Sequence, residues 1–239
     1  MNILVTGGAS GLGEAITTTL ASKTEHKVWF TYCKSKDKAK KLEASFSNCK
    51  GIYLDFTSEE SLAAFVEQMK ELNPEVLVNN ATTGMIKNHF HKISIDDFKL
   101  SFIRNVLPTV QITQEAIRIF RKKKSGRIIT ILSAYLIGKP PFGFAEYASN
   151  KAYLLEMSRC WATENVAFSI TSNCISPSMM QTQLTSDVDE RVVESMVAAH
   201  PLRRLLSTTE TANAVKFLVE GSEFINGVNL VLNAGSDFG

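Results

Sequence analysis

A glycine-rich turn near the amino terminus limits most strongly what this chain can fold into. The segment Thr6–Gly13 reads Thr-Gly-Gly-Ala-Ser-Gly-Leu-Gly, and it joins a predicted strand to a predicted helix that begins at Gly11. Gly7 permits a sharp exit from the strand, Gly11 lets an anion approach the backbone, and Gly13 lets the helix pack closely on the sheet. Glycine turns without a ligand are common. A turn after the first strand of a βαβ unit, however, favours a pyrophosphate site at the positive end of the helix.

Short β-branched runs alternate with longer amphipathic stretches along the chain. The predicted strands are Asn2–Thr6, Lys27–Tyr32, Gly51–Leu54, Glu75–Val78, Gly126–Leu132, Ser169–Ile175 and Val228–Leu232. The predicted helices are Gly11–Ser22, Asp37–Phe46, Ser58–Leu72, Ile95–Lys124, Ala145–Asn165, a looser Asp187–Ala198, and Thr208–Glu220. Strands that are apolar almost without interruption indicate a parallel sheet with helices on both faces. We therefore expect one α/β domain over residues 1–239, a doubly wound Rossmann-type sheet of about seven strands.

The composition is that of a folded protein without strong charge. Among 239 residues there are 26 Lys and Arg against 24 Asp and Glu, and 44% are hydrophobic, so neither a disordered chain nor a polyanion-binding tail is expected. The apolar runs are far shorter than the ~20 residues of a membrane-spanning helix. The first strand follows Met1 directly, which leaves no room for a leader peptide. We expect a cytoplasmic protein that binds neither membrane nor nucleic acid.

The end of the second predicted strand bears on which nucleotide would bind. The segment after Thr31 reads Tyr-Cys-Lys-Ser and has no carboxylate for a ribose 2′-hydroxyl, whereas Lys34 could contact a 2′-phosphate. This pattern favours NADP(H), with NAD possible and a solvated lysine as the alternative for Lys34. Asp55, after the third strand, is placed either to accept a hydrogen bond from an adenine amino group or to cap the next helix.

A tyrosine and a lysine four residues apart form the candidate catalytic pair. On one helix, Tyr147 and Lys151 lie on the same face in adjacent turns. A nearby positive charge favours the phenolate of tyrosine, whose pKa is otherwise near ~10, and so makes proton transfer useful closer to neutrality. Ser133 follows a predicted strand, at the edge where open α/β sheets bind ligands, and its hydroxyl could bond a carbonyl oxygen. Each feature alone has a structural alternative, but together they indicate a site.

At these positions the sequence resembles the short-chain dehydrogenase/reductase family, over nearly the whole chain. The shared features are the glycine turn, Asp55, the segment Asn79–Ala81, Asn105, Ser133, and Tyr147 with Lys151, in family order. The resemblance implies that Tyr147 is the acid/base, that Ser133 polarises the carbonyl, and that Lys151 lowers the pKa of the tyrosine and holds the nicotinamide ribose. It implies a relay water at Asn105. The implied contacts with the pyrophosphate are Gly7, Ser10, Gly11, Leu12 and Gly13. Asn80 is implied near the adenosine ribose and Thr182 near the carboxamide. Lys34, Asp55 and Lys151 complete the set of implied cofactor contacts.

The resemblance also implies an activity and an assembly. The closest named activity is 3-oxoacyl-[acyl-carrier-protein] reductase, which acts on a carrier-bound carbonyl, and a small-molecule carbonyl substrate is equally compatible. A sugar or secondary-metabolite ketoreductase is the alternative within the family, and a non-catalytic nucleotide-binding regulatory protein is the alternative of another class. A homotetramer or homodimer is implied, built from the helices Ile95–Lys124 and Ala145–Asn165 and from the last strand.

The chain departs from the family pattern at three places. Thr82 follows Asn79–Ala81 where the family has glycine, Ser178 follows Pro177 where glycine is usual, and Asn233-Ala234-Gly235 replaces Asp-Gly-Gly. These changes bear on cofactor contacts and loop geometry and remove no proton-transfer group.

A pair of histidines and a run of basic residues have ordinary structural explanations. His89 and His91 flank Phe90 without an evident third ligand, so we expect surface imidazoles and no metal. A basic run, Arg118–Arg127, closes the long predicted helix, where positive charge complements the helix dipole. An acidic carrier protein or a phosphorylated substrate is the alternative partner for that run.

Overall fold

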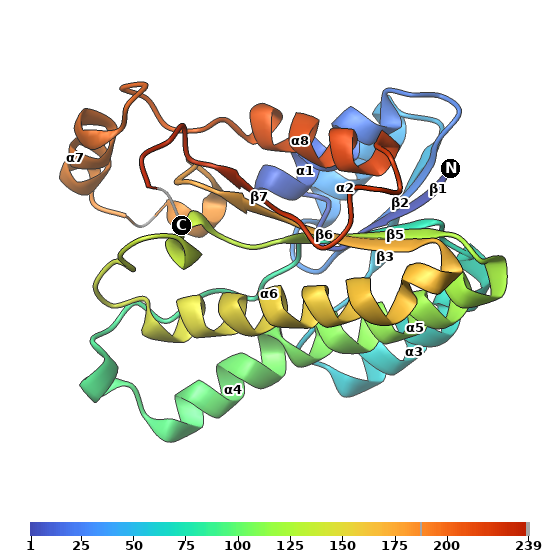
Figure 1. The fold of residues 1–239 in the computed structure, drawn as a ribbon, viewed down its shortest axis with the longest axis horizontal. Coiled ribbons are helices and arrows are strands. Elements are labelled where there is room, and N and C mark those ends of the chain that lie inside the picture. The colour runs from blue at the N-terminus through green and yellow to red at the C-terminus, as the bar shows by residue number, and fades with distance from the viewer. Residues whose placement is uncertain (187, 238–239) are drawn as a thin grey trace.

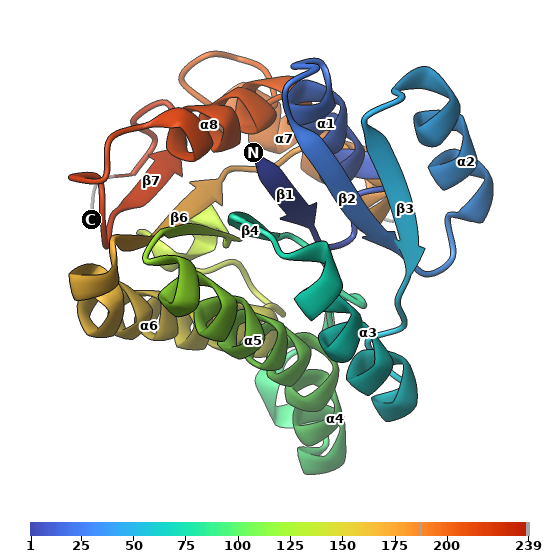
Figure 2. The ribbon, with the colours of Figure 1, turned by 90° about the vertical axis from the view of Figure 1, so that its right-hand side faces the viewer.

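The computed structural model describes residues 1–186 and 188–237, which contain a seven-stranded parallel sheet. The strands are β1 (Asn2–Val5), β2 (Lys27–Tyr32), β3 (Cys49–Tyr53), β4 (Val76–Asn79), β5 (Gly126–Ile131), β6 (Ile170–Pro177) and β7 (Asn229–Leu232). Their order is β3-β2-β1-β4-β5-β6-β7, and Figure 2 shows β3 and β7 at opposite edges. The predicted doubly wound sheet is confirmed, while the assignment of the chain to one domain stays a prediction.

Helices cover both faces of this sheet. They are α1 (Gly11–Ala21), α2 (Lys36–Ser45), α3 (Glu59–Leu72), α4 (Ile95–Asn105), α5 (Leu107–Lys123), α6 (Ala145–Asn165), α7 (Glu190–Ala199) and α8 (Thr208–Glu220). Short 3-10 helices are η1 (Phe90–Lys92), η2 (Ala134–Leu136), η3 (Val166–Phe168) and η4 (Gln183–Thr185). Figure 1 shows α1, α2 and α8 on one side of the sheet and α3, α5 and α6 on the other, with α4 and α7 at one end of the molecule.

Successive strand residues fill two separate cores. Ile3, Leu4 and Val5 of β1 are all fully buried. Ile3 and Val5 pack in a cluster that includes residues of α1 and α8, whereas Leu4 packs with residues of α3 and α5. Because neighbouring side chains of a strand point to opposite faces, a strand covered on both sides must be apolar throughout.

The strand order places a topological switch point beside β1. The chain builds β2 and β3 on one side of β1, then crosses to β4 on the other side, where Val5 pairs with Val78. At such a switch point the connections leave in opposite directions and open a crevice at the carboxyl ends of the strands. The glycine turn after β1 and the loop after β4 therefore meet there.

The helix predicted over Ile95–Lys124 is two helices, and the single-helix prediction was wrong. Helix α4 ends at Asn105 and α5 begins at Leu107. Pro108 lies in the first turn of α5, where it has no N–H to donate to the carbonyl four residues earlier and its ring crowds that carbonyl. The break puts Asn105 at the end of a helix rather than in its middle.

Smaller differences concern element ends. Strand β3 begins at Cys49 rather than Gly51, and β6 extends to Pro177. Helix α7 begins at Glu190, and the predicted start at Asp187 lies outside the described residues. In the described ranges, none of the helices is both long and apolar enough to cross a membrane.

The close approach of α5 to β5 gives a stability prediction. A Cβ at Gly126 would lie 2.3 Å from two ring carbons of the fully buried Phe120. Gly126→Ala should therefore lower the free energy of unfolding by ~1–3 kcal/mol, because the ring or the strand must shift. Urea denaturation measures this, with Ser125→Ala, an exposed neighbour, expected to change stability by less than ~0.5 kcal/mol. Equal midpoints for the wild type and Gly126→Ala would contradict the prediction.

Candidate active site

The glycine turn is held in place by the end of β4. The Thr6 hydroxyl accepts hydrogen bonds from the backbone N–H groups of Asn80 (3.0 Å) and Ala81 (3.1 Å). In return, the Asn80 side-chain amide donates to the carbonyls of Thr6 (3.0 Å) and Gly7 (3.1 Å). Asn80 therefore supports the turn directly, and its predicted place near the adenosine ribose stays a prediction.

Two glycines of the turn are required by its geometry. Gly7 has φ +64°, in the left-handed region that glycine adopts most readily. A Cβ at Gly13 would lie 2.0 Å from the Gly7 carbonyl oxygen, so no other residue fits there without moving backbone. These constraints explain why glycine recurs at this spacing.

The first turn of α1 offers a cradle for an anion. Ser10 is the N-cap, in an extended conformation, and its side chain makes no capping hydrogen bond. The backbone amides of Gly11, Leu12 and Gly13 begin the helix, where partial positive charge accumulates. A Cβ at Gly11 would meet only Thr182, at 3.5 Å. These residues fit a pyrophosphate, and Thr182 lies beside the cradle.

The adenosine end of the predicted site contains Lys34 and Asp55. Oδ1 of Asp55 accepts from the backbone N–H and the hydroxyl of Thr57, each at 2.8 Å. These two hydrogen bonds lower the pKa of Asp55, and the charges of Lys34 and Arg104 add to the effect. The cap of the next helix is Ser58, whose side chain accepts from the N–H of Ser61, so Asp55 holds the turn before that helix and does not cap it. Its adenine contact stays a prediction. Lys34 is exposed.

The three residues of the predicted catalytic group converge at the carboxyl end of β5. Lys151, on α6, donates from Nζ to the carbonyl of Ile131 at the end of that strand (2.8 Å). Its Nζ lies 5.7 Å from the centre of the Tyr147 ring, one turn earlier on the same helix. Ser133 follows β5, is buried, and hydrogen-bonds with Tyr147. The sequence spacing is therefore matched by proximity in the structure.

Burial acts on the two titratable groups in opposite directions. It raises the pKa of Tyr147 to about 12, and the hydrogen bond with Ser133 acts against this rise. It lowers the pKa of Lys151 to about 8. At neutral pH Tyr147 therefore carries its proton and Lys151 is mostly positive, the states that proton donation requires. The predicted lowering of the tyrosine pKa by Lys151 stays a prediction.

Asn105 enters the site from the end of α4. Its side-chain Oδ1 accepts from the backbone N–H of Thr83 (2.7 Å) and from the hydroxyls of Thr82 and Thr83 (3.0 Å each). Its backbone carbonyl accepts from the Thr109 hydroxyl (3.1 Å). Asn105 thus anchors the loop after β4, and its predicted relay water stays a prediction.

A small hollow joins these elements. Its lining comes from the loop after β4, from α4 and from α6, and consists of Ala81, Thr82, Gly84, Asn105, Glu146, Tyr147, Asn150, Lys151 and Leu154. Sequence reasoning missed Glu146 and Asn150, which are buried beside the catalytic pair. Their spacing of four residues, one position before Tyr147 and Lys151, was the available signal for a second polar face on α6.

The two histidines of the loop after β4 lie together at the surface. The ring centres of His89 and His91 are 5.9 Å apart, and His89 also lies 6.5 Å from the exposed Phe142. In the described part of the chain, His, Cys, Asp and Glu side chains form no group of three or more that could hold a metal ion.

Comparison with known proteins assigns the chain to a family. A family model described as enoyl-(acyl carrier protein) reductase matches residues 7–237. The chain is 31% identical to the 3-oxoacyl-[acyl-carrier-protein] reductase MabA of Mycobacterium avium, covering 100% of this chain and 90% of that protein. The chain belongs to the short-chain dehydrogenase/reductase family. The predicted resemblance is thereby confirmed, and with it the prediction of an oxidoreductase.

Other short-chain dehydrogenase/reductases match over similar lengths. FabG, a 3-oxoacyl-[acyl-carrier-protein] reductase of Escherichia coli K12, is 32% identical over 97% of this chain and 95% of its own length. The structure of ElxO with NADP bound superposes with a TM-score of 0.86 at 26% identity, covering 98% of this chain and 97% of the other. The likeness extends over essentially the whole chain.

Two of the three departures from the short-chain dehydrogenase/reductase pattern have structural accounts here. The Thr82 hydroxyl donates to Asn105, a bond that the usual glycine has no side chain to make. Ser178 donates its backbone N–H to the carbonyl of Leu232 (3.0 Å), and Asn233 accepts from the N–H of Gly235 (3.0 Å). The Ser178 bond is made by backbone that glycine also has, whereas the Asn233 amide donates to the carbonyl of Asp237 (2.8 Å), which an aspartate could not do.

Proposed function

We propose that this protein is an NADP(H)-dependent reductase that interconverts a carbonyl group and a secondary alcohol. The observation that carries the proposal is the convergence of Ser133, Tyr147 and Lys151 beside a turn that fits a pyrophosphate. When bound, the nicotinamide supplies or accepts the hydride. The chain itself must bind and orient the carbonyl and move one proton.

Each side chain has a distinct task in this scheme. The Tyr147 hydroxyl gives its proton to the carbonyl oxygen, and the Ser133 hydroxyl donates a hydrogen bond that orients and polarises the carbonyl. The Lys151 ammonium, fixed by the Ile131 carbonyl, lies close enough to stabilise the phenolate that remains. In the oxidation direction the same groups act in reverse.

Removing the proton donor tests this function and separates an enzyme from a nucleotide-binding scaffold. Tyr147→Phe retains the ring and deletes the hydroxyl, so kcat should fall by ~10²–10⁴ while NADPH affinity stays nearly unchanged. Steady-state kinetics with a carbonyl compound that the wild type reduces, together with NADPH titration, measures both quantities. Lys151→Ala should damage both, because Lys151 serves the phenol and the ribose. Turnover by Tyr147→Phe near the wild-type rate would reject the mechanism.

We infer NADPH rather than NADH as the preferred cofactor, with NAD possible. Strand β2 ends without a carboxylate, and Lys34 is exposed just beyond that strand. Ser35, the N-cap of α2, makes no side-chain capping bond and is available to a phosphate oxygen. The solved structure of ElxO, which contains NADP, supports this inference.

Removing the positive charge of Lys34 tests the cofactor preference. Lys34→Ala should weaken NADPH binding by ~1–3 kcal/mol and leave NADH binding nearly unchanged, because only the 2′-phosphate loses a charge-assisted hydrogen bond. Lys40→Ala, an exposed lysine on α2, is the matched control and should affect neither cofactor. Fluorescence titration with both nucleotides gives the affinities. Equal affinities of the wild type for NADPH and NADH would contradict the assignment.

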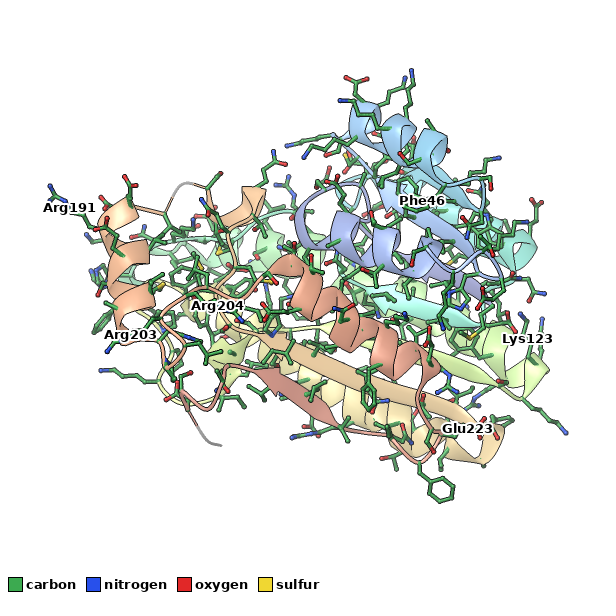
Figure 3. The ribbon with its side chains drawn as sticks, turned by 90° about the horizontal axis from the view of Figure 1, so that it is seen from above. Phe46, Lys123, Arg191, Arg203, Arg204 and Glu223 are labelled. Carbon is green, nitrogen blue, oxygen red and sulfur yellow. The ribbon has the colours of Figure 1, made fainter. Side chains whose placement is uncertain are left out.

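The substrate we propose is a 3-oxoacyl group on a carrier. The similarity to MabA and FabG supports this choice, since both are 3-oxoacyl-[acyl-carrier-protein] reductases. The basic run that closes α5 is poorly placed to receive that carrier. Lys123 lies at the end opposite α7, where its ammonium donates to the carbonyls of Asn73 and Pro74, whereas Arg191 and Arg203 lie at the α7 end (Figure 3). We therefore place the carrier at the α7 end, and we retain the cytoplasm as the expected location.

We also propose a homotetramer. Ile103, Leu107 and Tyr153 are exposed on α4, α5 and α6, beside a hollow between α5 and α6 that Trp161 and Met157 line. A second exposed apolar group, Phe217, Phe224 and Val228, lies on α8 and the approach to β7. Two self-complementary faces on one subunit generate a tetramer with three twofold axes.

The assembly is tested by light scattering at micromolar concentration. The wild type should give four times the 26.4 kDa chain mass. Phe224→Lys should give dimers, because it places a charge in one of the two faces and leaves the other intact. A 26.4 kDa species alone in the wild type would contradict the proposal.

A further inference from the structure

The side chain that precedes the catalytic tyrosine is a buried carboxylate. Glu146 is 1% exposed. Its Oε1 accepts from the Asn150 side-chain amide (2.6 Å) and from the Ser101 hydroxyl, and its Oε2 accepts from the backbone N–H of Ile86 (3.0 Å). None of the ion pairs among the described residues includes Glu146. A buried acid held by hydrogen-bond donors alone needs an explanation, since desolvating it is costly.

The hydrogen bonds around Glu146 have a fixed direction that reaches Asn105. The Asn105 amide nitrogen donates to the Ser101 hydroxyl (3.3 Å), and that hydroxyl donates onward to Glu146. Asn150 donates to both Ser101 (3.1 Å) and Glu146. Because the chain of donors ends at the carboxylate, the nitrogen of the Asn105 amide faces Ser101 and its oxygen faces the N–H of Thr83.

Few buried contacts fix α4 to the rest of the site. The ring of Phe102 lies edge-to-face against Tyr153 of α6, with ring centres 5.1 Å apart, and packs against the cluster that contains Leu154. Ser101 is the one buried residue of α4, all of whose residues the structure describes. Helix α5, by contrast, buries several apolar side chains against the sheet, among them Ile112 and Phe120. The contact between Ser101 and Glu146 is therefore the buried polar link between α4 and α6, beside the apolar contact of Phe102. Ile86 links the loop after β4 to the same carboxylate.

We propose that Glu146 is a positioning residue for carbonyl reduction, acting through Ser101 to hold Asn105 and the Thr82–Thr83 loop across the hollow from Tyr147. This role rests on the proposed function and adds a residue to it. Glu146 itself touches neither cofactor nor substrate in this role. It sets the separation and orientation of the two walls between which the carbonyl must lie.

The first test replaces the carboxylate with its neutral isostere. In Glu146→Gln, the side-chain NH₂ must face either the N–H of Ile86 or the donors Ser101 and Asn150, so the ordered set of acceptors is lost. We expect kcat for carbonyl reduction to fall ~10-fold or more. The KM for NADPH should stay within about twofold of the wild type, since the glycine turn is held by the separate bonds of Thr6 and Asn80. Glu156→Gln, an exposed glutamate on α6, is the matched control and should match the wild type.

A double-mutant cycle distinguishes positioning from a general structural role. If Glu146 acts through Asn105, then Glu146→Gln should have almost no further effect on kcat in a protein that already carries Asn105→Ala. A role in overall packing would lower kcat by the same factor in both backgrounds. An additive result overturns the proposal.

Ser101 provides an independent variant in case Glu146→Gln does not fold. Ser101→Ala removes the link while leaving the carboxylate, and should reduce kcat as Glu146→Gln does; Ser101→Thr keeps the hydroxyl and should restore most of the rate. A folded Ser101→Ala protein with wild-type kcat overturns the proposal, as does wild-type kcat in Glu146→Gln. The Tyr147→Phe variant, assayed on the same substrate, reports separately on the proposed function: if it retains turnover, that function fails whatever the Glu146 variants show.

Discussion

The hydrogen bonds between the end of β1 and the end of β4 are the constraint on which the site depends. Thr6 is buried, and its hydroxyl accepts two backbone N–H groups that follow β4. Such groups are costly to leave unpaired when buried, at about 1–3 kcal/mol each. The pairing therefore fixes at once the path of the glycine turn and the direction in which the chain leaves β4. The turn that would hold the nucleotide and the loop that reaches Asn105 both begin at this pair of hydrogen-bonded strand ends.

The local parts of this structure could be predicted from sequence, and the parts made by distant contacts could not. Strand positions follow from apolar runs, and the Tyr147–Lys151 face follows from the helical period. Pro108 was visible in the sequence, but the periodic apolar pattern continues across it and concealed the break. The network around Glu146 joins residues up to 60 positions apart, so no local pattern reveals it. Asn80 was recognised as a site residue, but the bonds that give it a structural task depend on where β1 and β4 meet.

Burial of the catalytic group has a chemical effect as well as a structural one. The same low-polarity surroundings oppose charge on both Tyr147 and Lys151, which raises one pKa and lowers the other. The two pKa values, about 12 and about 8, lie further apart than those of the free side chains, so Tyr147 holds its proton more tightly than a free tyrosine does. Ser133 is the described hydrogen-bond partner that works against the rise at Tyr147, so its hydroxyl tunes the acid as well as orienting the carbonyl.

The break between α4 and α5 separates two kinds of residue that a continuous helix would have joined. Helix α5 is part of the sheet's apolar core, whereas α4 projects beyond it and buries one polar side chain. Substitutions that tilt or lengthen α4 can therefore reshape one wall of the reaction chamber without disturbing the folding core. The same catalytic residues can in this way act on substrates of different size. Changes in substrate specificity then need not lower the stability of the fold.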